Sequence, residues 1–306
     1  MNTPFNFRLT KFPNEAEILR HEVREFLSDA LKDIPKETRA ETWYGADENF
    51  SRKVGQKGWI GLNWPKEYGG AGRSSMERYV ILEEMLTAGA PVGAHWISDR
   101  QSGPLIIRYG SEKHQKELLP GILKGESYFC IGMSEPDSGS DLAALRTKAE
   151  KKGNIYLVNG TKLWTSGAHR CQYMIALFKT SQEEDRHGGF SQFIVDLSLP
   201  GVTIRPIIDL AGRHHFNEVI FEDVEVPEDM LIGTEGNGWN QVTAELALER
   251  SGPERYLSSY ILLQELVNEF SNKNDDEGVI EIGRQMSHLT TLRQMSVSVA
   301  GMLDQG

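Results

Sequence analysis

Cysteine is scarce in this chain, which has two among its 306 residues, Cys130 and Cys171. The two lie far apart in the sequence and fit neither the spacing of metal ligands nor that of a disulfide framework. We therefore expect no metal site, and a reducing compartment, the cytoplasm. Each thiol is better explained as a small buried hydrophobic group than as a nucleophile.

Basic residues are also in deficit, since 33 Lys and Arg face 44 Asp and Glu, for a formal net charge of −11. No basic stripe is present, which argues against nucleic acid as the main partner. No apolar run is long enough to cross a bilayer, and the N-terminal residues lack the apolar stretch of an export signal. We expect a soluble protein without membrane insertion, with enough apolar residues for one large core or several smaller ones.

Helical periodicity dominates the first 126 residues. Apolar side chains recur every three or four positions in residues 14–31, in residues 75–87 and in residues 112–123, where Ser111 is a suitable N-cap. These patterns predict an all-α domain over residues 1–127.

The pattern then changes to short β-rich runs. The Asn159-Gly160 dipeptide lies between apolar residues and predicts a tight turn between two strands within residues 154–164. Further runs occur at residues 173–178, 192–196, 202–207 and 218–221. This spacing predicts a compact antiparallel barrel or sandwich over residues 128–235.

Helical spacing returns after Gly236. Residues at steps of three or four from Val242 to Phe270 predict one helix face, on which Glu249 is a carboxylate, and a last helix follows from Ile282 to Leu303. Two such helices cannot cover each other's apolar faces and also cap a barrel, so we expect the domain over residues 236–306 to be incomplete. The fold class is predicted to be α+β.

One loop has a direct chemical interpretation. Residues 134–141 read SEPDSGSD. Glycine allows the backbone to approach a ligand closely, and successive N–H groups and serine hydroxyls can hold phosphate oxygens. An ordinary surface turn has the same composition, and the loop alone favours that alternative.

A second segment, Trp164-Thr165-Ser166, changes this balance. An indole can cover the face of a flavin ring while a nearby hydroxyl donates to its N5 edge. A tryptophan in a strand is more often part of the core. The loop and the Trp-Thr-Ser segment together are more specific than either one.

These residues resemble the acyl-CoA dehydrogenase family, whose flavin site combines a Thr/Ser-Glu-Pro-x-x-Gly-Ser-Asp loop with a Trp-x-Thr/Ser segment. The resemblance extends to residues 64–72 (WPKEYGGAG), 109–112 (YGSE), 216–218 (FNE) and 236–239 (GNGW). It implies FAD as cofactor and a set of cofactor-binding residues: Ile131, Gly132, Met133, Ser134, Gly139, Ser140, Trp164, Thr165 and Ser166. Ser134 and Ser166 each stand where threonine is commoner in the family, which keeps the hydroxyl.

The resemblance also implies α,β-dehydrogenation of an acyl-CoA thioester, in which a carboxylate removes the α-proton and flavin N5 receives the β-hydride. Glu249 is the candidate base. Its apolar helix face should raise its pKa by desolvation, and a local kink at Gly252 and Pro253 would expose that turn. The alternative is a structural Glu249 that pairs with an arginine or another chain, and a base in a later segment also stays open. Ser140, Leu246, Ala247 and Arg250 are implied as substrate-binding residues.

Partners follow from the same resemblance: an electron-transferring flavoprotein as electron acceptor, and a homo- or hetero-oligomer, either dimer or tetramer. The chain resembles a family member truncated at the C-terminus. Two alternatives of other kinds remain open, a flavin monooxygenase or oxidase of the same fold and a non-catalytic subunit of a heteromeric acyl-CoA dehydrogenase.

Overall fold

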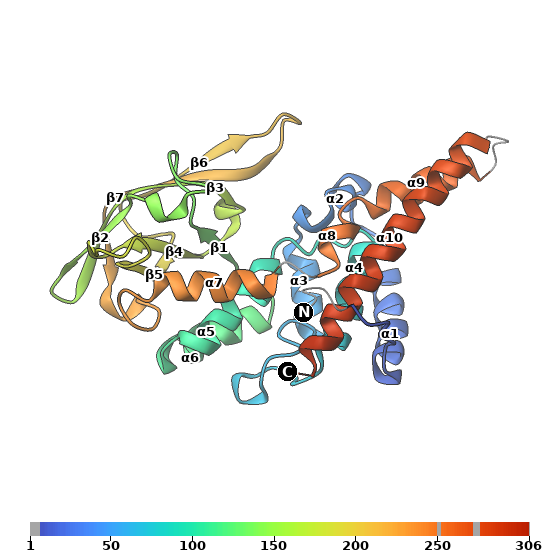
Figure 1. Ribbon diagram of the computed structural model, residues 1–306, viewed down its shortest axis with the longest axis horizontal. Helices are drawn as coiled ribbons and strands as arrows, with labels where there is room; N and C mark the ends of the chain where they lie inside the picture. The colour runs from blue at the N-terminus through green and yellow to red at the C-terminus, as the bar shows by residue number, and fades with distance from the viewer. Residues whose placement is uncertain (1–6, 250–251, 272–275, 306) are drawn as a thin grey trace, which may run out of the picture. The chain divides into compact units, whose positions relative to one another are not determined.

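The computed structural model describes residues 7–249, 252–271 and 276–305 (Figure 1). The chain divides into two compact units. The first unit contains residues 1–93 and 249–306, and the second contains residues 94–248. Each unit has its own buried side chains, and the predicted boundaries of three consecutive domains stay a prediction.

The N-terminal part of the first unit is helical, as predicted. Its α-helices are α1 (Asn14–Ala30), α2 (Lys36–Ala40), α3 (Glu48–Gln56) and α4 (Ser75–Thr87). Helix α4 begins at Ser74, which forms a capping box with Glu77 because each side chain satisfies a backbone N–H of the other. The predicted α1 and α4 are confirmed within one residue.

Charged side chains join α1 to α4 inside this unit. Arg20 donates to Glu83 at 2.8 Å and also bonds Glu84, and all three side chains are buried. Arg24 donates to Glu84 from the exposed side of α1. The carboxylates of α4 are therefore paired, as buried charges must be.

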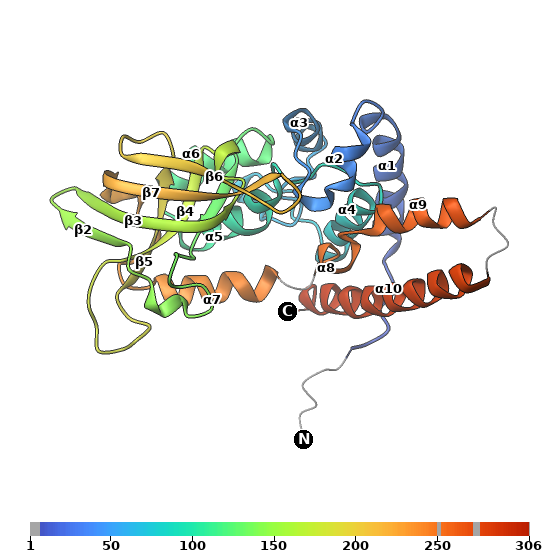
Figure 2. The same cartoon turned by 90° about the horizontal axis from the view of Figure 1, so that it is seen from above.

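The C-terminal helices of the first unit are α8 (Glu254–Leu257), α9 (Tyr260–Phe270) and α10 (Asp276–Leu303). Figure 2 shows α9 and α10 running in opposite directions. The prediction of one continuous helix face from Val242 to Phe270 is wrong, because Gly252 and Pro253 are non-helical and Pro253 is the N-cap of α8.

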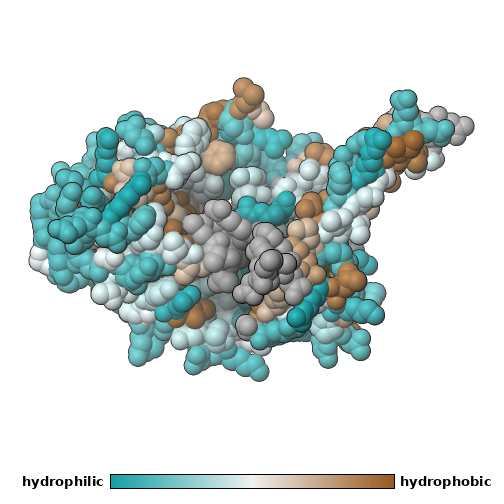
Figure 3. Space-filling view, viewed as in Figure 1, coloured by the Kyte–Doolittle hydropathy of each residue, from teal (hydrophilic) through white to brown (hydrophobic). Residues whose placement is uncertain are grey.

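Large apolar side chains remain exposed on α9 and α10, and part of this surface is brown in Figure 3. They are Leu262, Leu266, Val267, Val279, Ile280, Met286, Leu292, Met295, Met302 and Leu303. In the described residues, these two helices thus leave an extended apolar surface in contact with solvent.

The helices of the second unit are α5 (Gly103–Tyr109), α6 (Glu112–Leu123) and α7 (Gly238–Glu249), with a π-helix at Ser98–Ser102 before α5. The predicted Ser111 N-cap is confirmed, since its Oγ accepts from the His114 N–H at 3.2 Å. Helix α7 lies along the sheet (Figure 1). Its Val242 side chain joins a buried cluster with Leu145, Leu177 and Phe190.

The second unit is built on one curled sheet of seven strands (Figures 1 and 2). The strands are β1 (Phe129–Gly132), β2 (Lys148–Lys152), β3 (Ile155–Ser166), β4 (Tyr173–Lys179), β5 (Phe190–Asp196), β6 (Val202–Ile208) and β7 (His214–Pro227). The order is β1-β4-β2-β3-β7-β6, with β5 on β4. The α+β class is confirmed, and the sheet adds two parallel pairings, β1 with β4 and β2 with β4.

The predicted turn at Asn159-Gly160 is wrong, because β3 runs straight through it. The turn lies earlier, at Gly153, where Lys152 of β2 pairs with Ile155 of β3. The Asn159 side chain instead bonds both the backbone N–H and the carboxylate of Asp223 on β7. Gly160 is needed for close approach, since a Cβ there would lie 2.7 Å from the Thr147 Cα.

The sheet encloses an apolar core, so β4 and β5 are buried almost throughout, whereas burial alternates along parts of β3 and β7. Tyr156, Val158, Phe178, Phe193 and Phe221 are buried in one cluster. The same cluster contains Cys130, which is fully buried as predicted, and half-buried Cys171 packs against it. Burial, together with Cys171, raises the pKa of the Cys130 thiol.

Candidate functional site

The two segments predicted to bind a flavin lie next to each other in the sheet. Ile131 and Gly132 end β1, and Met133 and Ser134 begin the following loop. The Leu163 N–H of β3 donates to the Ser134 carbonyl at 2.8 Å. Residues 131–134 are thus joined to the strand that carries Trp164.

Trp164 is 56% exposed, so the alternative of a core tryptophan is wrong. A bulge explains its position, because Leu163 and Trp164 of β3 face a single residue of β7, between the pairs Lys162–Val219 and Thr165–Asn217. The extra residue reverses the alternation of the strand. Trp164 also has a φ of 59°, a left-handed conformation that costs a bulky residue energy and is found mainly at functional sites.

Two buried hydroxyls in these segments have no hydrogen-bond partner within the described part of the chain. They are Thr165 Oγ1, next to Trp164, and Ser138 Oγ, in the SEPDSGSD loop. A buried polar atom without a partner costs free energy unless a ligand or water satisfies it. The residues present therefore fit a polar ligand, as a flavin cofactor requires.

The predicted loop residues Gly139 and Ser140 are exposed. A Cβ at Gly139 would meet no atom within 4 Å, so packing inside the chain does not require glycine there. The loop has its own short-range order, because Glu135 and Ser138 exchange two backbone hydrogen bonds of 2.9 and 3.2 Å.

An ion pair that was not predicted from the sequence joins the SEPDSGSD loop to β3, and both of its side chains are buried. Lys162 of β3 is completely buried and donates to Glu135 Oε1 at 2.8 Å and to the Met133 carbonyl at 3.1 Å. Burial lowers the pKa of Lys162 to about 8, although Glu135 acts in the opposite direction. Burial alone would raise the pKa of Glu135, but Lys162 and the nearby donors lower it. Glu135 belongs to the SEPDSGSD loop and Lys162 to the strands predicted within residues 154–164, but the sequence does not show that the two side chains are in contact.

A second group that was not predicted supports the backbone next to Trp164. Asn217 of β7 donates to the Thr165 carbonyl at 3.0 Å. Its Oδ1 lies 2.7 Å from His214 Nε2 and 3.2 Å from His169 Nδ1, and the two imidazole rings stack 3.8 Å apart. Desolvation, with His214 and Arg170 nearby, lowers the pKa of His169 to about 4. The cluster fixes the backbone beside Trp164.

The predicted base and the predicted substrate residues other than Ser140 fall in and after the last turns of α7. Leu246, Ala247 and Glu249 lie in that helix, and their side chains are outside the described part of the structure. Arg250 lies outside the described residues altogether. Where a local kink was predicted, α7 and α8 are two separate helices, with non-helical Gly252 and Pro253 between them.

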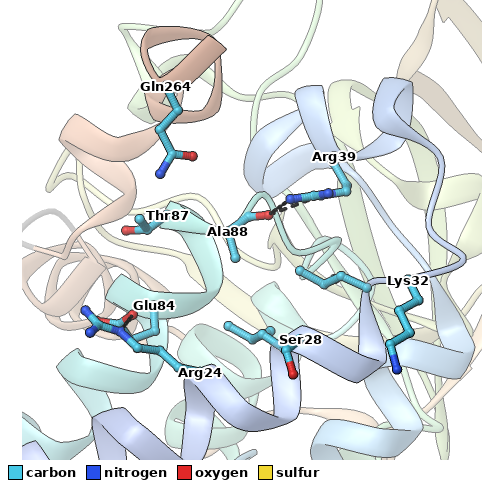
Figure 4. A pocket seen from close by; sticks show the side chains of 10 residues that line it. Arg24, Ser28, Lys32, Arg39, Glu84, Thr87, Ala88 and Gln264 are labelled. Carbon is cyan, nitrogen blue, oxygen red and sulfur yellow. Dashed lines mark hydrogen bonds and ion pairs between the residues drawn. The ribbon is translucent and has the colours of Figure 1, made fainter. Parts of the chain in front are cut away.

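The first unit contains a separate cavity of about 500 Å³ between α1, α2, α4 and α9 (Figure 4). Its charged groups already have partners: Arg24 bonds Glu84, and Arg39 donates twice to the Ala88 carbonyl at the end of α4. The Arg39 side chain thus caps the C-terminal end of α4, and these contacts explain the charged lining of the cavity without a ligand. Across the described residues, no group of three His, Cys, Asp or Glu side chains could hold a metal ion, and no helix could cross a membrane.

Comparison with known proteins identifies the family. Residues 13–126 match the model of the acyl-CoA dehydrogenase N-terminal domain, and residues 130–224 match that of the middle domain. The ChsE4-ChsE5 complex from Mycobacterium tuberculosis is 30% identical, with a TM-score of 0.83 over 96% of this chain and 78% of that chain. The chain belongs to the acyl-CoA dehydrogenase family. The alignment with whole structures covers helices at both ends as well as the sheet.

Two further relatives of the acyl-CoA dehydrogenase family are similar over most of this chain. Acyl-CoA dehydrogenase FadE29 of Mycobacterium tuberculosis is 38% identical over 250 residues, which are 80% of this chain and 64% of that protein. The Tcur3481-Tcur3483 steroid ACAD is 28% identical, with a TM-score of 0.83 over 96% of this chain and 78% of that chain. The chain thus spans slightly less than two thirds of the FadE29 length.

Proposed function

We propose that this chain takes part in the FAD-dependent α,β-dehydrogenation of an acyl-CoA thioester. The observation that carries the proposal is the pair of buried hydroxyls without partners, Thr165 Oγ1 and Ser138 Oγ, beside the exposed, left-handed Trp164. Unsatisfied buried hydroxyls and a strained backbone each cost folding free energy, and a bound cofactor that accepts or donates hydrogen bonds there would offset this cost.

The residues proposed to hold FAD are those of the predicted set in the β1 loop, the Gly-Ser loop and the end of β3: Ile131, Gly132, Met133, Ser134, Gly139, Ser140, Trp164, Thr165 and Ser166. When bound, FAD supplies the acceptor for a hydride from the acyl chain. The chain contributes hydroxyl and backbone donors for the polar edges of the cofactor, and the Trp164 indole excludes water from one side of the ring.

Glu249 is proposed as the general base that accepts the α-proton of the thioester, with Leu246, Ala247, Arg250 and Ser140 around the substrate. The support is its place at the end of α7, three residues before the non-helical Gly252 and Pro253. A carboxylate at such a break can reach a substrate that a carboxylate within a continuous helix cannot.

The partners are proposals as well. We propose an electron-transferring flavoprotein as electron acceptor, a cytoplasmic location, and a homo- or hetero-oligomer that covers the apolar surface of α9 and α10. The names of the ChsE4-ChsE5 complex and the Tcur3481-Tcur3483 steroid ACAD describe two-component assemblies, which favours the hetero-oligomer. Because the second of these names contains the word steroid, a steroid acyl thioester belongs among the candidate substrates.

Anaerobic titration of the FAD-loaded, assembled protein with a panel of acyl-CoA thioesters tests the proposal. The expected result is loss of the flavin absorbance with at least one thioester, because the flavin is reduced as the acyl chain is oxidised. If no thioester bleaches the flavin and the chemically reduced flavin reacts rapidly with oxygen, the oxidase or monooxygenase alternative replaces the proposal.

Glu249→Gln tests the base. We expect bleaching to slow by about 100- to 10,000-fold, since the variant cannot accept a proton. The matched control is Glu245→Gln, one helical turn earlier in α7, which should bleach at the wild-type rate. Full bleaching by the Glu249→Gln variant would assign the proton transfer to another residue.

A further inference from the structure

We propose that the buried pair of Lys162 and Glu135 is a clamp that positions the two flavin-binding segments relative to each other, so that both residues act on the cofactor without touching it. The inference rests on the proposed function and deepens it. It assigns a role to a buried lysine of β3 and a buried glutamate of the loop at residues 134–141, neither of which the predicted flavin-binding set includes.

Glu135 closes the Gly-Ser loop at both ends. Its Oε2 accepts the Arg146 N–H at 2.6 Å, and its Oε1 accepts the Thr147 N–H at 3.0 Å. Those N–H groups lie directly before β2, whereas Glu135 follows β1 by three residues. One carboxylate therefore brings the start and the end of the loop together, and the unpartnered Ser138 hydroxyl lies between them.

Lys162 connects this closed loop to β3. Its ammonium group donates two hydrogen bonds, one to the Glu135 carboxylate and one to the Met133 carbonyl, and it also makes a cation–π contact with the Phe178 ring, whose centroid is 5.6 Å away. Met133 belongs to the first predicted flavin-binding segment. Two residues after Lys162, Trp164 begins the second.

The path of Lys162 through the sheet also depends on the first segment. A Cβ at Gly132 would lie 2.3 Å from Met174 Sδ and 3.3 Å from Lys162 Cγ, so the missing side chain leaves room for the lysine stem. The bulge that turns Trp164 outward begins directly after Lys162. A fixed lysine at that point sets where the alternation of β3 reverses.

An ordinary buried ion pair would stabilise the fold without influencing the cofactor, so the test must separate stability from positioning. The variants are Lys162→Met, Glu135→Gln and the double variant, made in the full chain with any partner it needs. The double variant leaves no buried unpaired charge. The matched control is Lys151→Met with Glu228→Gln, which removes an exposed ion pair between β2 and the residue after β7.

Three measurements are made on each variant: the melting temperature, the affinity for added FAD by fluorescence titration, and hydrogen exchange of residues 134–147 without FAD. We expect the double variant to melt within a few degrees of the wild type, to bind FAD at least tenfold more weakly and to exchange faster in the loop. The control should match the wild type in all three. Equal FAD affinity and loop exchange in the double variant and the wild type would overturn the clamp.

The two proposals fail in different ways. If the wild type binds no FAD at any concentration, the proposed function is wrong, and the exchange measurement still shows whether the pair orders the loop. If the wild type binds FAD and the Lys162→Met variant does not fold, the Glu135→Gln and double variants decide the outcome through the same measurements.

Discussion

Arg293 of α10 is the residue whose removal should reveal how the C-terminal helices are held in the first unit. It donates to Glu83 of α4 through two bonds of 2.6 and 3.0 Å. Glu83 is 5% exposed and also accepts from Arg20 at 2.8 Å and from the Tyr256 hydroxyl at 3.2 Å. The perturbation we consider is Arg293→Met, which keeps the length of the side chain and removes its charge.

The expected loss of unfolding free energy depends on the hydrogen-bond partners that Glu83 retains in the variant. Burial alone would raise the pKa of Glu83, but hydrogen bonds from Arg293 and Arg20 lower it below its usual value. Breaking a buried ion pair costs about 3–5 kcal/mol when the remaining charge has no partner. Arg20 and Tyr256 remain, and a hydrogen bond to a charged group contributes about 1.5–3 kcal/mol, so we expect a loss of about 2–3 kcal/mol. This corresponds to a fall in Tm of about 5–10 °C.

Urea unfolding and calorimetry of the wild type, Arg293→Met, Glu83→Gln and the double variant measure this loss and the coupling between the two side chains. A coupling free energy above about 1 kcal/mol is expected for groups in direct contact. Arg284→Met on the same helix, where the arginine pairs with exposed Glu281, is the control and should change stability by less than about 0.5 kcal/mol. Equal losses for Arg293→Met and Arg284→Met would refute the reasoning.

Three further outcomes are expected. Gly160→Ala should cost about 2–4 kcal/mol in urea unfolding, because the new Cβ would collide with the Thr147 backbone and the φ of 145° is unfavourable for alanine; a change below 0.5 kcal/mol would contradict the close approach. Burial lowers the pKa of His95 to about 4, partly opposed by Asp99, so the unfolded chain binds the extra proton first. The wild type should therefore lose about 3 kcal/mol relative to His95→Gln as the pH falls from 6.5 to 4, and parallel pH profiles would exclude the effect. Trp164→Gly should relieve the left-handed conformation and leave stability unchanged or about 1 kcal/mol higher while weakening FAD binding; a variant that binds FAD as the wild type does would remove Trp164 from the site.

The sequence predicted those parts of the fold that depend on local patterns. The periodicity of α1, α4 and α6 and the Ser111 cap are properties of neighbouring residues, and the structure agrees with them. The Asn159-Gly160 turn failed because the side chain that makes Asn-Gly a turn signal is bonded to Asp223, 64 residues later. A long-range contact of this kind overrides a local preference and cannot be read from the dipeptide.

The sequence motifs of the candidate site could be predicted, but the buried side chains and the strand bulge that hold these motifs in place could not. The loop and Trp164 stood out by composition, whereas Lys162 resembled any lysine in a strand, a residue type that is rarely buried. Only the fold shows that Glu135 and Met133 lie within reach of its ammonium group. The exposed position of Trp164 was hidden for a similar reason, since it depends on a bulge defined by the pairing of β3 with β7.

The hydrogen bonds around the candidate site also suggest an order of folding. Glu135 contacts Arg146, Thr147 and Lys162 over at most 27 residues, whereas Asn217 reaches the Thr165 carbonyl from 52 residues away. Contacts between near neighbours close smaller loops and form sooner. We expect the half of the candidate site around residues 134–147 to take shape early in synthesis, and the half beside Trp164 to wait until β7 has left the ribosome.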